Sequence, residues 1–346
     1  MLETGSAVAE QIDRLLAHMF HAETARWIRV DRALADPVQA LARLVLSGGK
    51  RLRPLFTYLT YTGAGGSNED LVINAGAALE LMHTAALIHD DVMDRSLMRR
   101  GEPSTHHHFT LKHQGQDWQG DSARFGDSAA VVIGDLSLFY AGLLLASAPA
   151  QARLVFDEAG IETSMGQYLE LLQSARGSRE LQLSWVVTRY KAAKYSVERP
   201  MHLGAALAGR LPDLKDQLSA AGLLLGEAFQ LKDDLLGAFG DPVQTGKRVG
   251  EDFREGRWSV LLAIAAERSI DGDQSLLGRV GARDLDASEI TGLQRLLIST
   301  GAKEAVEITC EQLVDRALAV IDSLPLTAPA RDGLAALARY VCRRTA

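Results

Sequence analysis

Two aspartates four residues apart, Asp90 and Asp94, are the first residues whose spacing predicts chemistry. Side chains so spaced on a helix lie on one face, with Cβ atoms about 5–6 Å apart. The like charges repel, and the dipole at the carboxyl end of a helix also disfavours anions. A divalent cation relieves both effects, and oxygen-only ligands select a hard ion, Mg²⁺ above all. The pair therefore predicts a magnesium site, against the alternative of a solvated acidic helix end.

A second acidic pair, Asp233 and Asp234, follows another strongly apolar segment. The residues before the two pairs, 85–88 and 223–229, are too apolar for the surface of a protein, so both segments are expected to be buried helices. Each helix then delivers carboxylates to the mouth of a buried space. Two such helix ends favour metal binding over a solvated acidic end.

Basic clusters accompany the acidic groups. Lys50, Arg51 and Arg53 follow two glycines, and Arg99 and Arg100 follow the first acidic group closely. A diphosphate carries several negative charges, and arginine forks and lysine point charges are the donors that bind it. Each cluster alone is typical of a solvated face. Together with the acidic helix ends they predict a site where Mg²⁺ and protein cations share phosphate oxygens.

The overall charge excludes one class of function. The 346 residues carry 37 Lys and Arg against 44 Asp and Glu, a net charge of −7, which argues against a nucleic-acid binder. Segment 1–28 has acidic residues and no apolar core of a signal peptide, so we expect a cytoplasmic protein. The longest apolar stretch, 128–150, contains Asp135 and is expected to be a buried helix rather than a transmembrane segment.

The elements that must position these residues are helices. Apolar residues recur at spacings of three and four along most of the chain, with few alternating β-branched runs, which predicts an all-α fold. The length allows two domains, or one large helical core with a central cavity. The predicted helices around the acidic groups and between them span 68–94, 103–114, 127–148, 150–174, 182–197, 200–209 and 212–238.

Seven sequence elements, in their order along the chain, resemble the trans-isoprenyl diphosphate synthases, which are polyprenyl synthetases, of the geranylgeranyl type. They are GGKRLRP (48–54), HTAALIHDDVMD (83–94), RRGEPSTH (99–106), GD (134–135), KYSVERP (194–200), FQLKDD (229–234) and GKRVGEDFREGRWS (246–259). The resemblance covers about residues 36–344. It implies one all-α domain over 1–346, an isoprenoid synthase bundle around a central substrate cavity, and a homodimer.

The resemblance also implies a role for each matching residue. The metal ligands are Asp90, Asp91, Asp94, Asp233 and Asp234, which would hold about three Mg²⁺ ions. The ligands of isopentenyl diphosphate are Lys50, Arg53, His83 and Arg100. The residues that bind the allylic diphosphate or act on it are Arg99, Lys194, Lys247, Gln230 and Arg257, with Tyr195 or Ser196 in place of a common threonine. Arg257 stands where lysine is usual, and Gly237 stands where many relatives have a third aspartate.

The helix before Asp90 also predicts product length. If the growing chain runs along this helix, each turn of about 5.4 Å spans about one isoprene unit. Ala85 and Ala86 leave the first turn open, whereas Leu81 and Met82 can close the next turn. This pattern favours geranylgeranyl diphosphate as the product. The alternative is that the two alanines only allow close helix packing.

The expected activity is a prenyl transfer that condenses isopentenyl diphosphate with dimethylallyl, geranyl or farnesyl diphosphate. Ionisation of the allylic C–O bond, attack by the isopentenyl double bond and proton loss to pyrophosphate need no side-chain nucleophile, but they need a cavity that excludes water. The alternatives are a farnesyl or longer-chain synthase, a class I terpene cyclase and a non-catalytic prenyl synthase subunit. A cyclase lacks the GGKR-type second diphosphate site, and such a subunit is expected to lack the acidic residues.

Overall fold

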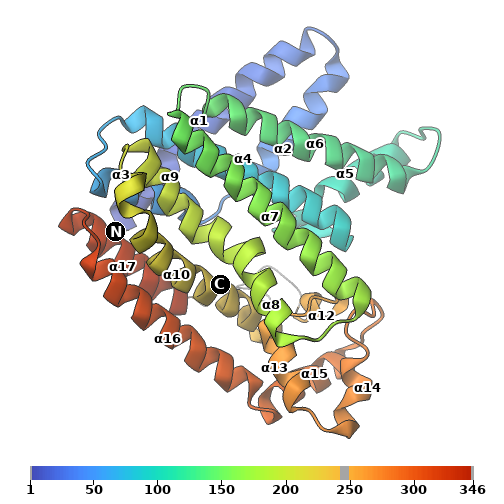
Figure 1. The fold of residues 1–346 in the computed structure, drawn as a ribbon. Helices are drawn as coiled ribbons and strands as arrows, with labels where there is room; N and C mark the ends of the chain where they lie inside the picture. The colour runs from blue at the N-terminus through green and yellow to red at the C-terminus, as the bar shows by residue number, and fades with distance from the viewer. Residues whose placement is uncertain (1, 242–248, 344–346) are drawn as a thin grey trace.

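The computed structural model describes residues 2–241 and 249–343, and it confirms the all-α fold (Figure 1). The strands within these ranges are β1 (Met98–Arg99) and β2 (Glu102–Pro103), which form one antiparallel pair. The helices that precede the pair are α1 (Leu2–Ile28), η1 (Arg32–Leu34), α2 (Ala35–Leu46), α3 (Leu52–Gly63) and α4 (Glu69–Asp94). Those that follow it are α5 (Thr105–Gly115), α6 (Ser122–Leu144), α7 (Ala150–Arg176), α8 (Leu181–Val187), η2 (Thr188–Glu198), α9 (Arg199–Leu207), α10 (Leu211–Phe239), α12 (Glu251–Glu255), α13 (Val260–Arg268), η3 (Asp271–Asp273), α14 (Gln274–Leu277), α15 (Ala287–Ser299), α16 (Ala302–Ser323) and α17 (Ala328–Arg343).

Helix α4 carries the first acidic group, and its ends are fixed locally. The side chain of Asn68 accepts a hydrogen bond from the backbone N–H of Leu71 at 3.1 Å, which caps the amino end. At the other end Arg95 adopts a left-handed conformation (φ 54°), so the helix stops directly after Asp94. Most of the apolar part of α4 is buried, as the sequence predicts for a core helix.

Helix α10 carries the second acidic group and packs against η2, α16 and α9. The small helices α12 to α15 gather at one end of the long helices (Figure 1). The acidic end of α4 contacts this group, because Ser96 donates a hydrogen bond to Glu255 at 2.9 Å and Arg283 donates one to the backbone oxygen of Asp94 at 3.2 Å. The carboxyl ends of α4 and α10 therefore meet near α12.

The predicted helix 182–197 is split into α8 and a π-helix, η2. Glycines on the neighbouring helices let their backbones approach η2 closely. A Cβ on Gly166 of α7 would lie 2.3 Å from the backbone nitrogen of Lys191, and one on Gly226 of α10 would lie 2.4 Å from the backbone oxygen of Ala193. A π-helix has more residues in each turn than an α-helix. Residues of η2 therefore do not face the directions expected from the turn of about 3.6 residues of an α-helix.

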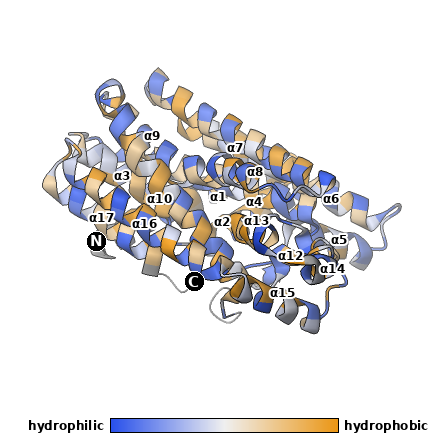
Figure 2. Cartoon of the chain, turned by 60° about the horizontal axis from the view of Figure 1, so that its bottom comes forward, coloured by the Kyte–Doolittle hydropathy of each residue, from blue (hydrophilic) through white to orange (hydrophobic). Residues whose placement is uncertain are grey.

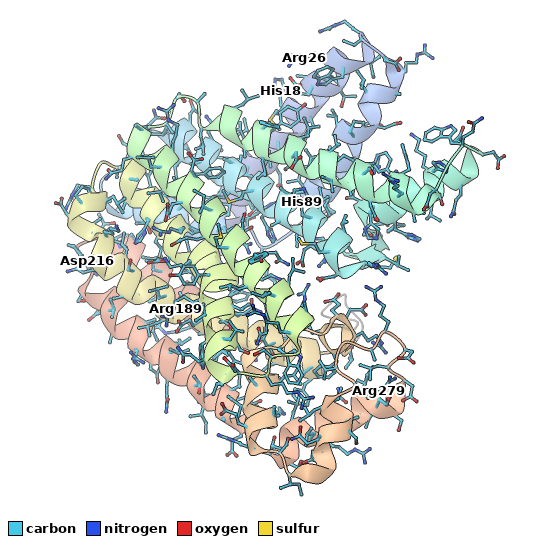
Figure 3. The ribbon with its side chains drawn as sticks, turned by 45° about the vertical axis from the view of Figure 1, so that its right-hand side comes forward. His18, Arg26, His89, Arg189, Asp216 and Arg279 are labelled. Atoms are coloured by element: carbon cyan, nitrogen blue, oxygen red, sulfur yellow. The ribbon has the colours of Figure 1, made fainter. Side chains whose placement is uncertain are left out.

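The apolar stretch around Asp135 forms part of α6, and the expectation that it is buried is wrong. By length and composition α4 and α6 both resemble membrane-spanning helices, but only 33% of the apolar window of α6 is buried, against 72% for α4. The side chain of Asp135 is 56% exposed and lies 3.7 Å from the imidazole of His89, which Figure 3 labels on α4. One side of α6 thus faces α4, and another side carries exposed apolar residues.

Candidate active site

A cavity of about 390 Å³ lies between α4, α7, η2 and α10, beside segment 249–259. Its size is within the range of small-molecule sites, about 300–1,000 Å³. The residues predicted from sequence that line it are Arg53, His83, Ala86, Asp90, Tyr195, Ser196, Gln230, Asp233, Asp234 and Arg257. Apolar side chains, among them Leu87, Val187 and Phe229, form other parts of its wall. The cavity therefore combines charged groups with a surface that can exclude water.

The carboxylates of Asp90 and Asp94 share a cation that the protein itself supplies. Nη2 of Arg257 donates a hydrogen bond to Asp90 at 2.8 Å and another to Asp94, and Nζ of Lys191 donates to Asp90 at 3.3 Å. Burial raises the pKa of Asp90, but Arg257 and Lys191 outweigh burial and hold that pKa well below its usual range. For Asp94, burial outweighs Arg257 and raises the pKa to about 6. The pair therefore takes up a first proton far more readily than a second.

Asp91 is not brought to the cavity, although the sequence predicts it as a metal ligand. Its side chain is fully buried, and Nε of Arg99 donates a hydrogen bond to it at 3.0 Å. Neither Asp91 nor Arg99 lines the cavity. In a helix the side chains of adjacent residues point about 100° apart, so Asp91 faces away from the direction of Asp90. In this structure Asp91 holds Arg99 in place.

The second acidic group contains a buried carboxylate oxygen that needs a partner. Nε2 of Gln230 donates a hydrogen bond to Oδ1 of Asp234 at 2.7 Å, whereas Oδ2 is buried with no hydrogen-bond partner among the described residues. Burial, with the nearby charges of Asp252 and Asp233, raises the pKa of Asp234 to about 8. A cation near this oxygen would stabilise the ionised form. The donor set, carboxylate oxygens alone, fits a hard divalent ion.

The structure accounts for the glycine in the second acidic group. A Cβ on Gly237 would lie 2.2 Å from Oδ2 of Asp252, and both residues line the cavity. Asp252, which comes from α12, therefore places its carboxylate where a side chain at position 237 would begin. The sequence gives no signal for this proximity, because the two residues belong to separate helices. Across the described residues, no three His, Cys, Asp or Glu side chains are already arranged to hold a metal ion.

Arg53 forms the basic side of the cavity, where its guanidinium lies over the ring of Tyr195. The guanidinium carbon of Arg53 lies 4.3 Å from the ring centroid of Tyr195, and Nη2 donates a hydrogen bond to Ser196 at 3.1 Å. The rings of Tyr195 and His83 lie 6.1 Å apart between centroids. Burial, followed by the charge of Arg53, lowers the pKa of His83 well below its usual value. His83 is therefore neutral near pH 7 and can donate one ring N–H without adding charge.

Lys50 and Arg100 lie outside the set of residues that line the cavity. Arg100, in a left-handed conformation (φ 54°), donates hydrogen bonds to the backbone oxygen of Gly48 at 2.5 Å and to that of Leu44 at 3.2 Å. Nζ of Lys50 lies 5.4 Å from the ring centroid of Tyr340 in α17. Arg100, in the turn between β1 and β2, is thus attached to the chain at Leu44 and Gly48, and Lys50 reaches the carboxyl-terminal helix.

Of the two lysines in η2, the structure directs the unexpected one into the cavity. Lys194, a predicted catalytic residue, pairs with Glu162 at 2.5 Å and with Glu198 at 3.5 Å, and it does not line the cavity. Lys191 lines the cavity and bonds to Glu170 as well as to Asp90. The family resemblance implies Lys194, the lysine directly before Tyr195, instead. The π-helix sets the directions of these two lysine side chains. Lys247, the other predicted lysine, lies outside the described residues.

Only part of the predicted chain-length wall faces the cavity. Ala86 lines it, whereas Ala85 and Leu81 are fully buried elsewhere. Met82, one turn before Ala86, is buried, and its terminal methyl lies 3.6 Å from the place of a Cβ on Gly160 of α7. Ala86 and Met82 stand four and eight residues before Asp90, on the same helix face. Met82 is therefore the side chain that meets α7 beyond Ala86.

The family follows from comparison with known proteins. Residues 36–296 match the sequence model of the polyprenyl synthetase family. The chain belongs to this family. It is 34% identical to geranylgeranyl pyrophosphate synthase from Corynebacterium glutamicum, whose crystal structure, complexed with isoprenyl diphosphate and magnesium, has a TM-score of 0.92 and aligns over 97% of this chain and 98% of that chain.

Curated polyprenyl synthetases are similar over most of their length. Geranylfarnesyl diphosphate synthase from Aeropyrum pernix is 30% identical over 88% of this chain and 93% of its own length. Nonaprenyl diphosphate synthase from Mycobacterium tuberculosis is 29% identical over 91% of this chain and 88% of its own length. The predicted resemblance to trans-isoprenyl diphosphate synthases is thus confirmed, and this polyprenyl synthetase is a transferase. The names of these relatives cover products of different lengths, so family membership does not establish the length of the product.

Proposed function

We propose that this chain condenses isopentenyl diphosphate with the allylic dimethylallyl, geranyl and farnesyl diphosphates to give geranylgeranyl diphosphate. The observation that carries this proposal is the meeting of two carboxylate groups, from α4 and α10, with the basic side at Arg53 in one cavity. Such a cavity offers one place for a diphosphate bound through divalent ions and another for a diphosphate bound by protein cations.

The residues in the cavity and next to it have distinct proposed roles. The residues that would hold about three Mg²⁺ ions are Asp90, Asp233, Asp234 and Asp252, which line the cavity, and Asp94, which shares Arg257 with Asp90. Bound there, the metal would supply the positive charge that stabilises a departing diphosphate. Lys191 and Arg257 donate to the allylic diphosphate, and Arg53, His83, Lys50 and Arg100 bind the isopentenyl diphosphate. Gln230 faces the reacting carbon atoms, and the apolar wall with Leu87 and Phe229 keeps water from the allylic cation.

Incubation of the purified protein with Mg²⁺, isopentenyl diphosphate and each allylic diphosphate in turn tests the proposal. After dephosphorylation, the products are identified by mass. Geranylgeraniol as the main product supports it, and longer or shorter alcohols keep the reaction but overturn the assigned length. Cyclic hydrocarbons from an allylic diphosphate alone would indicate a cyclase, and the absence of any product would indicate a non-catalytic subunit.

Two substitutions in the wall of α4 should change product length in opposite directions. Phenylalanine at Ala86 fills the cavity one turn before Asp90, so Ala86→Phe is expected to shift the main product to farnesyl diphosphate or a shorter one. Met82→Ala removes the side chain that meets α7, so it is expected to give longer products. Product masses after dephosphorylation report both changes, and circular dichroism checks the fold. An unchanged distribution of product lengths in both variants would contradict the proposal that this wall limits product length.

The position of Asp252 allows a rescue experiment. Asp252→Ala is expected to lower activity and Mg²⁺ affinity at least about tenfold, because a carboxylate that supports the metal site is lost. Adding Gly237→Asp to this variant places a carboxylate on α10 close to the position of the lost Asp252 carboxylate. The double variant should therefore recover part of the activity and part of the Mg²⁺ affinity. Calorimetric Mg²⁺ titration and initial rates measure the effect. If Asp252→Ala alone has no effect, Asp252 does not support the metal site.

We also propose that the enzyme is a cytoplasmic homodimer formed through α6 and α7. Exposed apolar residues recur along both helices at spacings of three, four and seven: Val132, Phe139, Leu143, Leu154, Ile161, Met165 and Tyr168. Figure 2 shows hydrophobic segments, in orange, along α6 and α7. Phe139 and Leu154 are 73% and 68% exposed in the single chain. Apolar surface of this extent is rare on monomers, and two-fold self-association is the usual way to cover it.

Phe139→Glu is expected to convert the dimer into a monomer, because it places a charge in the apolar contact. Size-exclusion chromatography with light scattering measures the mass of the particle. Ile298→Glu on α15 is the matched control, since Ile298 is 56% exposed and lies outside α6 and α7. A monomeric wild-type protein, or a variant that remains dimeric, would refute this interface.

A further inference from the structure

The guanidinium of Arg257 lies within 4 Å of four carboxylates. Besides its hydrogen bonds to Asp90 and Asp94, its guanidinium lies 3.0 Å from Glu255 and 3.8 Å from Asp252. Burial would lower the pKa of Arg257, but nearby carboxylates, Asp90 foremost and Glu170 next, raise it well above its ordinary value. The guanidinium therefore stays charged at every accessible pH.

Nη2 of Arg257 lies where a metal ion that bridges Asp90 and Asp94 would have to bind. The same Nη2 contacts Oδ2 of Asp90 and Oδ2 of Asp94, so it lies between the two carboxylates. An ion that bridges these two carboxylates requires the same oxygens. A guanidinium and a divalent ion cannot both occupy that position, because their positive charges repel and both would fill the same space between the two oxygens.

The backbone before Arg257 holds the guanidinium at this position. Gly256 adopts a left-handed conformation (φ 76°) that ends α12, and Ser174 donates a hydrogen bond to its carbonyl oxygen at 3.0 Å. Ser96, directly beyond α4, donates a hydrogen bond to Glu255 at 2.9 Å. The segment is thus attached to both α4 and α7. Arg257 is presented to the aspartates by structure that does not depend on a metal.

We propose that Arg257 is a resident counter-cation of the first aspartate group, and that it competes with the divalent ion until a diphosphate draws it away. The inference rests on the proposed function, since it assumes that Asp90 and Asp94 hold the metal. Without substrate, Arg257 neutralises the two carboxylates and keeps the site closed to metal. A diphosphate offers the guanidinium equivalent oxygen acceptors, so metal and diphosphate bind together.

Arginine suits this role better than the lysine usual at this position. The planar fork of a guanidinium directs several N–H groups in fixed directions, and here its nitrogens lie within 4 Å of four carboxylates on α4 and α12, two of which accept hydrogen bonds. An ammonium group is a compact and more strongly hydrated charge that cannot span them. The Arg257→Lys variant should therefore hold the aspartates less firmly and compete with the metal less well.

Titration of the metal-free enzyme with Mg²⁺ alone, followed by calorimetry, tests this inference. If Arg257 occupies the carboxylates in nine-tenths or more of the molecules, Arg257→Met should bind Mg²⁺ at least about tenfold more tightly than the wild type. Arg283→Met is the matched control, because Arg283 donates to the backbone oxygen of Asp94 at 3.2 Å without an ion pair to either carboxylate. Its effect should stay below about twofold, as for an exposed charge screened by solvent.

Thermal unfolding gives a second measurement. In the presence of EDTA, Arg257→Met should melt at a lower temperature than the wild type, because Asp94 loses its cation, and Mg²⁺ should restore most of the difference. Equal Mg²⁺ affinity in the wild type and Arg257→Met, or an equal change in Arg283→Met, would overturn the inference. If Arg257→Met does not fold, Arg257→Lys is judged by the same titration: tighter binding supports the inference, and unchanged binding overturns it.

The outcome is separable from the proposed function. Failure of the wild type to condense any allylic diphosphate would refute the function, whatever the titration shows. If the wild type condenses the substrates and the Arg257 variants show no change of Mg²⁺ affinity, only the competition between Arg257 and the metal is refuted.

Discussion

Asp90→Asn is expected to lower kcat/KM for condensation at least about a thousandfold while the fold is retained. The substitution removes the carboxylate that accepts from both Arg257 and Lys191 at the edge of the cavity. Amide and carboxylate have nearly the same shape, so packing should not change. Initial rates with geranyl diphosphate and isopentenyl diphosphate at saturating Mg²⁺ measure the loss.

The control for this variant is Asp135→Asn, which removes an exposed carboxylate from α6 and should leave the rate unchanged within about twofold. Circular dichroism and the melting temperature establish that both variants are folded. If the activity of Asp90→Asn is near that of the wild type, Asp90 is not a metal ligand. Asp233→Asn is expected to behave like Asp90→Asn, because it belongs to the acidic group on the facing helix.

The two lysines of η2 should give opposite results when each is replaced by methionine. Lys191→Met removes a cation that lines the cavity, so we expect kcat/KM to fall at least about a hundredfold. Lys194→Met leaves the cavity unchanged but deprives Glu162 and Glu198 of a partner, so it should lower the free energy of unfolding by about 1–3 kcal/mol and change the rate little.

Steady-state kinetics and urea unfolding measure these two effects on the same preparations. Each variant is the control for the other, since both remove one lysine charge from the same π-helix. A large loss of rate in Lys194→Met with little loss in Lys191→Met would favour the interpretation made from the sequence. The structure favours the reverse order.

The sequence was sufficient to predict the helices that carry the acidic groups and their meeting at one site. Apolar periodicity placed them at 68–94 and 212–238, and the structure has Glu69–Asp94 and Leu211–Phe239. Both are long helices with strongly apolar cores, for which local pattern and tertiary burial agree. The acidic pairs stand at their carboxyl ends, so the position of Asp90 and Asp233 followed directly.

Residues whose direction depends on tertiary contacts were not predictable in this way. Lys191 points into the cavity because η2 is a π-helix, which arises where Gly166 and Gly226 allow close approach of other helices. Asp91 turns toward Arg99 rather than the cavity. Asp252 reaches Gly237 from a separate helix, a proximity that no spacing along the chain reveals.

The ion pair between Arg257 and Asp94 joins residues 163 positions apart, which has a consequence for the order of folding. The last turn of α4 has no basic residue of its own, so Asp90 and Asp94 repel each other until distant cations arrive. Contacts of such sequence separation form late, because closing a long loop loses chain entropy. During synthesis, the carboxyl-terminal turn of α4 is therefore expected to remain frayed until residue 257 has left the ribosome. The acidic end of this helix is therefore expected to become ordered only with the last third of the chain.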